Sequence, residues 1–303
     1  MCDKPNYLLE QEVIWKREAH RAKQQVHAQC LWTFNRFEIT RIQWKATGVP
    51  KLTYANSVLA SRASNQLTAE LERAQTAVGK WAMGISGHRV ASEFVRGELG
   101  WSTFEAREAQ SKIRYFTRIG AMGAQRWPRM IISMMAIENL QTEAVKRMRT
   151  LSNKYSCGDI PLEYTGENKP RISLFNSNVK KRVKEKMEEK WRENMNSKSS
   201  LEGRPTQRLY INSRGSALMA LARAGMLPTR SHRARYQHID PHCIKCGTEE
   251  ETIPHIIMEC TPHHFEDNEI AKRLGFTGDE DGNTRGETRK LLENWENETR
   301  RIC

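Results

Sequence analysis

Apolar residues recur at the spacing of an α-helix in several stretches of the first two-thirds of this 303-residue chain. The most regular stretch puts seven apolar side chains on one face: Leu67, Leu71, Ala74, Val78, Trp81, Ala82 and Ile85. Gly84 and Gly87 are expected to end this helix, because glycine readily adopts the backbone conformation found at helix C-termini. The pattern predicts an amphipathic helix packed on a core.

A second helix is predicted after residue 102, where Ser102-Thr103-Phe104-Glu105 has the form of a capping box. One stripe of this helix is apolar: Ala109, Ile113 and Phe116. Arg107, Arg114 and Arg118 line another stripe, so three guanidinium groups could follow successive phosphates of a nucleic acid. A solvated helix face would give the same pattern, and both interpretations stay open at this point.

The N-terminal region from Gln11 to about Ala46 is charged and aromatic. Six side chains are expected to anchor it in a core: Trp15, Leu31, Trp32, Phe34, Phe37 and Trp44. Gly48-Val49-Pro50 is expected to break the helix, which resumes over residues 51–59. The Met-rich stretch 130–137 is also expected to pack in a core.

A charged helix is predicted from about Asn178 to Met195. Its apolar residues lie four apart and form a narrow seam for packing on one side: Val179, Val183, Met187, Trp191 and Met195. Its other face is basic: Lys180, Lys181, Arg182, Lys184, Lys186 and Lys190. Segments rich in Asn, Ser, Gly or Pro flank this helix, which predicts a linker around it.

Four potential metal ligands follow the spacing C-x2-C-x8-H-x4-C: Cys243, Cys246, His255 and Cys260. Three thiols and one imidazole form a complete tetrahedral set for structural zinc, with no open position for an activated water. Gly247 permits a tight turn after the first ligand pair, and Pro254 could open a short helix that carries His255. The alternatives are a disulfide cluster or coincidence. We expect a structural Zn²⁺ as the cofactor.

Basic residues outnumber acidic ones, with 49 Lys and Arg against 36 Asp and Glu, for a net charge of +13. The excess lies in residues 1–264, where the balance is 42 against 26, whereas the tail is acidic. Such a balance predicts a polyanionic partner, most commonly nucleic acid, although a merely soluble basic protein is the alternative. Further candidate contacts surround the first ligand pair: Arg230, Arg233, Arg235 and Lys245.

The start of the chain is polar, and no apolar run approaches membrane-spanning length. The seven cysteines are an odd number, and those outside the cluster are scattered, which fits a reducing compartment. The expectation is therefore a nuclear or cytoplasmic protein without a signal peptide or a membrane partner. Its oligomeric state is left open.

The motifs of several enzyme classes are missing from the sequence. It has no Asp-Asp pair of the kind that holds the metal ions of a polymerase. It also lacks HExxH, a phosphate-binding loop, GxSxG and GxGxxG. We therefore expect no catalytic residues, no small-molecule substrate and no enzyme activity.

With these features in view, the chain resembles the C-terminal part of non-LTR (LINE-type) retrotransposon reverse transcriptases. The resemblance rests on three segments that occur in the family's order. The first is Gly48-Val49-Pro50-Lys51-Leu52-Thr53-Tyr54-Ala55-Asn56, and the second combines Leu71-Glu72-Arg73-Ala74-Gln75 with Gly97-Glu98-Leu99-Gly100-Trp101 and Glu105-Ala106-Arg107. The third combines Arg223-Ala224-Gly225-Met226-Leu227 with the Cys243–Cys260 cluster and its internal Glu251-Thr252. The fingers, the palm with its aspartates, and any endonuclease segment are missing. The resemblance implies a truncated, transposon-derived region that binds RNA or DNA without polymerising.

The expected fold is mainly α, with a helical thumb and linker bundle followed by a small CCHC zinc knuckle. Four segments are expected: a helical thumb-like region (1–151), a linker with a charged helix (152–205), a basic approach with the knuckle (206–264), and an acidic, partly disordered tail (265–303). The alternative function is a zinc-folded protein-interaction module, in which the Val179–Met195 seam receives a partner helix.

Overall fold

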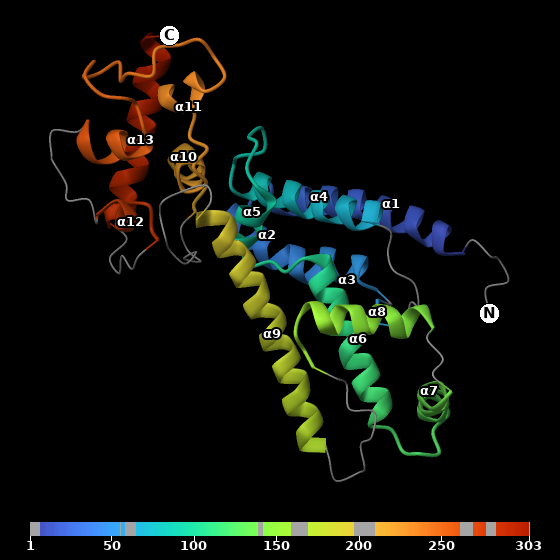
Figure 1. Ribbon diagram of the computed structural model, residues 1–303. Helices are drawn as coiled ribbons and strands as arrows, with labels where there is room; N and C mark the ends of the chain where they lie inside the picture. Colours follow the sequence, from blue (N-terminus) through green and yellow to red (C-terminus); the bar gives the residue numbers. More distant parts are fainter. Residues whose placement is uncertain are drawn as a thin grey trace. The chain divides into compact units, whose positions relative to one another are not determined.

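The structure, a computed structural model, describes residues 7–54, 56–57, 65–138, 142–158, 169–196, 210–260, 269–276 and 283–302 (Figure 1). It is mainly helical, as predicted. These residues contain no β-strand, only an isolated antiparallel bridge between His242 and Glu250. None of the helices in this part of the chain combines the length and apolar character needed to cross a membrane.

The chain divides into two compact units that each combine separate segments. Unit 1 comprises Met1–Gln24, Lys45–Ala74 and Ser102–Lys190, and unit 2 comprises Gln25–Trp44, Gln75–Trp101 and Trp191–Cys303. Helices α1 (Tyr7–Cys30), α4 (Asn65–Ala82) and α9 (Lys169–Asn196) contribute residues to both units. The units do not coincide with the four segments expected from composition, and whether those segments act as domains stays a prediction. Parts of the expected linker, 159–168 and 197–205, lie outside the described residues.

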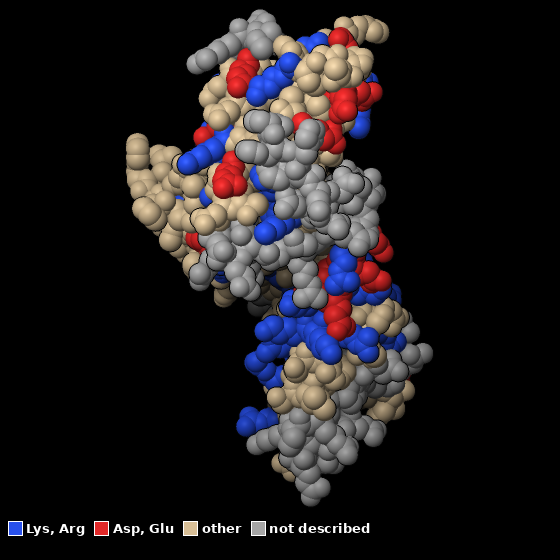
Figure 2. All heavy atoms as spheres, turned by 90° about the vertical axis from the view of Figure 1, so that its left-hand side faces the viewer, with Lys and Arg blue, Asp and Glu red and all other residues tan. Residues whose placement is uncertain are grey.

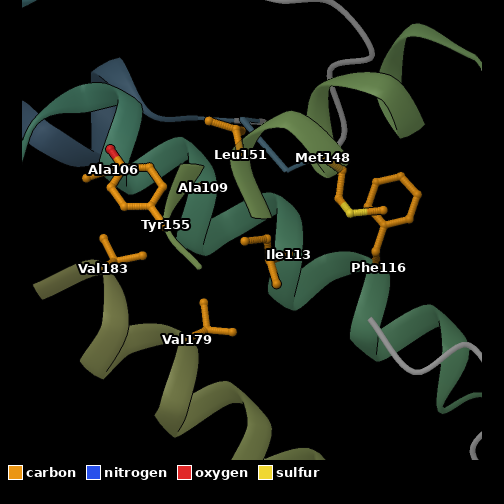
Figure 3. Packing of buried hydrophobic residues seen from close by; sticks show 9 residues of the cluster. All are labelled: Ala106, Ala109, Ile113, Phe116, Met148, Leu151, Tyr155, Val179 and Val183. Atoms are coloured by element: carbon orange, nitrogen blue, oxygen red, sulfur yellow. The ribbon is translucent and has the colours of Figure 1, made fainter. Parts of the chain in front are cut away.

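The core of unit 1 lies between three helices, α6 (Phe104–Gly120), α8 (Glu143–Lys154) and α9, with Tyr155 directly after α8. Figure 3 shows its members: Ala106, Ala109, Ile113, Phe116, Met148, Leu151, Tyr155, Val179 and Val183. The predicted apolar stripe of α6 is therefore confirmed as buried. The capping residue of α6 is Thr103 rather than Ser102, and the hydroxyl of Thr103 accepts from the Ala106 N–H at 3.1 Å.

The apolar seam of α9 is covered by the protein's own helices. Val179 and Val183 are buried against α6 and α8, and Met187 is partly buried beside them. The helix is longer than predicted, beginning at Lys169 instead of about Asn178. The part of the seam within unit 1 is thus occupied, and it is not available to a partner helix.

Helix α7 (Trp127–Ile137), in unit 1, corrects the expectation that the Met-rich stretch is core. Ile132 packs against the core of unit 1, but five larger apolar side chains are exposed: Trp127, Met130, Ile131, Met134 and Ile137. The sequence misleads here because this helix is apolar on nearly all sides, whereas only one side of a single helix can contact α6.

The N-terminal region departs from the predicted continuous helix. Helix α1 ends at Cys30. A loop follows, and α2 (Arg36–Gln43) begins after this loop with Asn35 as its N-terminal cap. Conversely, the chain stays helical through Gly48-Val49-Pro50, as a π-helical turn η1 (Trp44–Gly48) and α3 (Val49–Leu52). Proline is tolerated there because it lies in the first turn, where its missing N–H is not needed.

Only half of the expected N-terminal core anchors are buried. Trp15, Phe37 and Trp44 are, as predicted, in the core, but Leu31, Trp32 and Phe34 are exposed. The three exposed residues fall in the loop between α1 and α2, where no helical face directs them inward.

Unit 2 packs the second half of α4 with α5 (Ser92–Leu99) and the C-terminal elements. These are α10 (Arg214–Arg223), α11 (Arg230–Ala234), the π-helical turn η3 (His255–Glu259), α12 (Glu269–Arg273) and α13 (Asn283–Ile302). The predicted helix over 67–85 is confirmed as α4, and Gly84 follows it with a positive φ of 73°. Gly79 of α4 allows close packing, since a Cβ there would lie 2.4 Å from Val95.

A buried ion pair joins three elements of unit 2. Arg223 Nη2 donates to Glu98 Oε1 at 2.8 Å, and both side chains are fully buried. The Tyr210 hydroxyl donates to the other oxygen of Glu98 at 2.6 Å. Arg223 also donates to the Leu274 carbonyl after α12, and its guanidinium lies 4.1 Å from the ring centre of Phe276. Glu98 and Arg223, both in segments that carry the resemblance, thus hold the fold together.

Within the tail that was expected to be acidic and partly disordered, residues 283–302 form α13, whereas the acidic stretch 279–281 lies outside the described residues. Leu292 and Trp295 of α13 are buried, and the helix packs against α10. Two acidic residues of α13 have partners at the start of α10: Glu293 accepts from the Gly215 N–H, and Glu296 pairs with Arg214. Acidic composition therefore reflects pairing with α10 in this segment.

Candidate metal centre

The four predicted metal ligands come together in unit 2. Their ligand atoms all lie within 4.8 Å of one another. Cys243 Sγ is 3.5 Å from Cys260 Sγ, and Cys246 Sγ is 3.4 Å from His255 Nε2. In a tetrahedral zinc site, bond lengths of about 2.3 Å to sulfur and about 2.0 Å to nitrogen separate ligand atoms by roughly 3.5–3.8 Å. The cluster can therefore hold a metal ion, and its dimensions fit zinc.

Backbone hydrogen bonds fold the ligand loop. The Gly247 N–H donates to the Cys243 carbonyl at 2.8 Å, and Gly247 has a positive φ of 67°, as its predicted role requires. The Cys243 N–H donates to Glu249 O at 2.8 Å, beside the His242–Glu250 bridge. His255 and Cys260 lie on and directly after η3, in which the Cys260 N–H donates to His255 O. Pro254 opens this helical segment, as predicted.

Two carboxylates orient the imidazole of His255. Its Nδ1 lies 3.1 Å from a carboxylate oxygen of Glu249 and 3.1 Å from one of Glu259. A proton on Nδ1 can be donated to either, which leaves the lone pair of Nε2 directed at the sulfur cluster. Metal-binding histidines are commonly held in this way. These two glutamates were not predicted, although Glu259 lies one turn after His255.

The protonation of the ligands depends on their surroundings. Hydrogen bonds from the side chain and backbone of Thr248 and the Glu249 N–H lower the pKa of Cys246 to about 6. Burial and then the neighbouring Cys243 raise the pKa of Cys260 to about 12. Burial lowers the pKa of His255, but hydrogen bonds with Cys243 and Glu259 outweigh it and raise that pKa to about 9.

We predict that metal affinity falls steeply on acidification. Near pH 7 the metal-free His255 and Cys260 both hold protons that a metal must displace, because only the neutral imidazole and the thiolate bind it. With at least two displaced protons, the affinity should drop at least about 100-fold for each pH unit between 8 and 6. Isothermal titration in buffers of different ionisation enthalpy measures the protons released. Binding that is independent of pH over this range would contradict the ligand assignment.

Glu251 and Thr252, which the resemblance pointed to, have structural roles in this loop. The buried carboxylate of Glu251 accepts from the Arg230 N–H at 2.8 Å, at the start of α11. The Thr252 hydroxyl accepts from the His255 N–H at 3.2 Å and starts η3. Glu251 therefore fixes the basic approach to the ligand loop.

The cluster of potential metal ligands is packed against the C-terminal helices. Ile256, Ile257 and Met258 of η3 are buried, and η3 contacts both α12 and α13. At the other end of the loop, Lys245 Nζ lies 2.7 Å from a carboxylate oxygen of Glu298 in α13. The cluster thus belongs to a larger packed unit.

The predicted nucleic-acid contacts are spread over both units. In α6, Arg114 and Arg118 are exposed, whereas Arg107 is half-buried with its guanidinium 4.8 Å from the ring centre of Phe104. All six predicted lysines and arginines of α9 are exposed, and Figure 2 shows basic side chains gathered on the side of the molecule where α9 lies. In unit 2, Arg235 is exposed, Arg230 and Arg233 are half-buried, and Lys245 is paired with Glu298.

The net positive charge is concentrated in unit 1. This unit has 27 Lys and Arg against 16 Asp and Glu, a balance of +11, whereas unit 2 has 22 against 20, a balance of +2. The ligand loop from His242 to Cys260 contains one lysine and four glutamates. An electrostatic attraction for polyanions therefore originates in unit 1 and not in the loop that carries the potential metal ligands.

Comparison with family models, curated proteins and solved structures finds no match to this chain.

Proposed function

We propose that this protein binds RNA or DNA through the basic surface of unit 1, and that a zinc ion folds the C-terminal part of unit 2. The concentration of charge in unit 1 is the observation that carries the proposal. The order of the motifs that resemble non-LTR retrotransposon reverse transcriptases supports it. Within this proposal the chain is a transposon-derived, non-catalytic nucleic-acid-binding region.

The zinc ion would be held by Cys243, Cys246, His255 and Cys260. With all four positions filled by protein ligands, its contribution is structural and not catalytic. Metal binding would stabilise the loop on which α11 depends and the surface on which α12 and α13 pack.

Phosphate contacts would come chiefly from α9, together with Arg114 and Arg118 of α6. Val179 and Val183 fix one side of α9 in the core, so the lysines of the other side face solvent. Some of these lysines lie near glutamates of the same helix, such as Lys181 and Glu185 at 3.8 Å. Such exposed pairs are worth at most about 1 kcal/mol, so a phosphate can displace the glutamate.

We predict that neutralising three lysines of α9, as Lys180→Gln, Lys181→Gln and Lys184→Gln, weakens binding in proportion to their phosphate contacts. Each lost contact lowers the slope of log affinity against log salt by about 0.9 on duplex DNA and about 0.7 on a single strand. The triple variant should therefore lose up to roughly 2–3 units of slope. Fluorescence anisotropy with a labelled duplex and a labelled single strand over a salt series measures it.

The matched control is Lys245→Gln in the ligand loop. Lys245 lies in an acidic loop and is already paired with Glu298 of α13. Its replacement should therefore leave the slope of log affinity against log salt unchanged within experimental error. The proposal would be contradicted if the triple α9 variant kept an unchanged slope while Lys245→Gln had a large effect. That result would place the phosphate contacts on the ligand loop.

A protein-interaction module is the second candidate, and α7 is the observation that favours it. Its exposed apolar side chains form a stripe along the helix at helical spacing. Three residues of the α9 seam that first suggested this function, Val179, Val183 and Met187, pack in or against the core of unit 1. Association with a protein partner that survives nuclease treatment would favour this candidate.

A further inference from the structure

The loop between α1 and α2 presents two aromatic side chains entirely to solvent. Trp32 is 91% exposed and Phe34 is 101% exposed, with Leu31 half exposed before them. The flanking residues Cys30 and Phe37 are buried. Between these buried residues, the loop therefore presents two large rings that do not pack in the core of unit 2.

The backbone of this loop is held in place by residues from the other end of unit 2. The side-chain amide of Asn212 donates to Thr33 O at 2.9 Å and to Phe34 O at 3.2 Å. Its oxygen accepts from the Arg36 N–H at 2.9 Å. Asn35 caps α2 by accepting from the Glu38 N–H at 3.1 Å. The loop is therefore fixed, although neither ring contributes to packing.

The charged groups at the base of the loop are mainly cationic. Arg36 follows the loop, and its guanidinium lies 5.2 Å from the ring centre of Trp81, which in turn stacks on His27 at 4.3 Å. Lys80 adjoins Trp81 and donates to the His88 carbonyl. The nearest acidic residue in sequence, Glu38, is paired with Arg41 at 2.8 Å. Two exposed rings on a fixed backbone, followed in sequence by an arginine, suit a ligand with flat apolar groups and a negative backbone.

We propose that Trp32 and Phe34 stack on unpaired bases, so that this loop gives the protein an affinity for single-stranded nucleic acid. This inference rests on the nucleic-acid binding proposed above and adds a second, non-electrostatic site. Unpaired bases expose both faces to an aromatic ring, whereas bases within a duplex stack on one another. A protein partner fits less well, because a stable interface buries about 800 Å² on each side, and the exposed apolar surface of this loop is limited to Leu31 and two rings separated by a polar threonine.

The test compares the wild-type protein with the double variant Trp32→Ala/Phe34→Ala. The probes are a labelled 12-nucleotide oligo-dT, the same length of oligo-U, and a 12-base-pair duplex. Stacking on an aromatic ring is worth roughly fivefold to a hundredfold in affinity for each base. The double variant should lose at least about 25-fold in affinity for the single strands with an unchanged salt slope. Its affinity for the duplex should change by less than about twofold.

Three further variants separate stacking from other effects. Trp32→Phe keeps a flat ring and should retain single-strand affinity within a few-fold. Asn212→Ala releases the loop and should produce a partial loss for single strands only. Trp127→Ala removes an equally bulky exposed ring from α7 and should have no effect.

The possible results are distinguishable. Unchanged single-strand affinity in the double variant overturns the stacking inference and leaves the rings to a protein partner. The inference is also overturned if the double variant loses as much affinity for the duplex as for the single strands. It is likewise overturned if Trp127→Ala loses as much single-strand affinity as the double variant. If the wild-type protein binds none of the probes at low salt, the proposed function fails together with this inference.

Discussion

Replacing Cys243 by serine should abolish the proposed zinc binding and unfold the C-terminal part of unit 2. Cys243 is buried and faces Cys260 across the cluster, so serine leaves an incomplete ligand set inside the protein. Structural zinc contributes roughly 10–16 kcal/mol in small zinc-binding units, which exceeds the stability of most domains. The ligand loop fixes α11 through Glu251 and packs on α12 and α13, so we expect all three helices to lose protection from hydrogen exchange.

The core of unit 1 should be unaffected by the same change. Ile113, Leu151 and Val183 belong to a separate cluster of buried residues, so amides of α6 and α8 should exchange as slowly as in the wild type. Cys157→Ser is the matched control, since this half-buried thiol lies outside the metal cluster. A Cys243→Ser protein that keeps one metal ion and full protection over residues 229–260 would contradict the assignment of Cys243 as a required ligand of a structural metal.

Breaking the buried ion pair of unit 2 should have the next largest effect. With Glu98→Leu, the guanidinium of Arg223 stays fully buried without its counter-charge, and Arg223→Met leaves the carboxylate of Glu98 in the same position. Removing one partner of such a pair costs about 3–5 kcal/mol, whereas replacing both by apolar residues is often neutral. The double variant Glu98→Leu/Arg223→Met should therefore be more stable than either single variant.

Hydrogen exchange at amides of α10 measures these changes, because α10 is almost wholly buried. Lys146→Ala breaks an exposed pair with Glu143 in unit 1 and should change stability by no more than about 0.5 kcal/mol. The ion pair does not hold α5, α10 and α12 together as described if either single variant loses as little stability as Lys146→Ala. The same conclusion follows if the double variant is the least stable of the three.

The cluster of potential metal ligands was predictable because its geometry depends on local spacing. The four ligands lie within eighteen residues, and Gly247 and Pro254 act as the sequence suggested. The helices with a regular apolar face, α4 and α6, were predictable for the same reason, since helical periodicity directly reports which side is buried.

Features that depend on distant residues were not predictable. The partner of Glu98 is 125 residues away, and two carboxylates of α13 pair with α10 across about 80 residues, so composition alone did not predict that residues 283–302 form a packed helix. The prediction that Trp32, Phe34 and the Met-rich stretch of α7 pack in a core was also wrong for their exposed side chains. Hydrophobicity alone does not show whether a neighbouring element covers a side chain. The concentration of charge in unit 1 became visible only when the segments of each unit were known.

The most direct test of nucleic-acid binding is the affinity of the zinc-loaded wild-type protein for matched single-stranded RNA and duplex DNA over a series of salt concentrations. We predict tight binding at low salt and a steep fall as salt rises, since exposed lysines and arginines of unit 1 would contact several phosphates. Binding that is absent at low salt, or that is indifferent to salt, would mean that the basic surface does not bind nucleic acid.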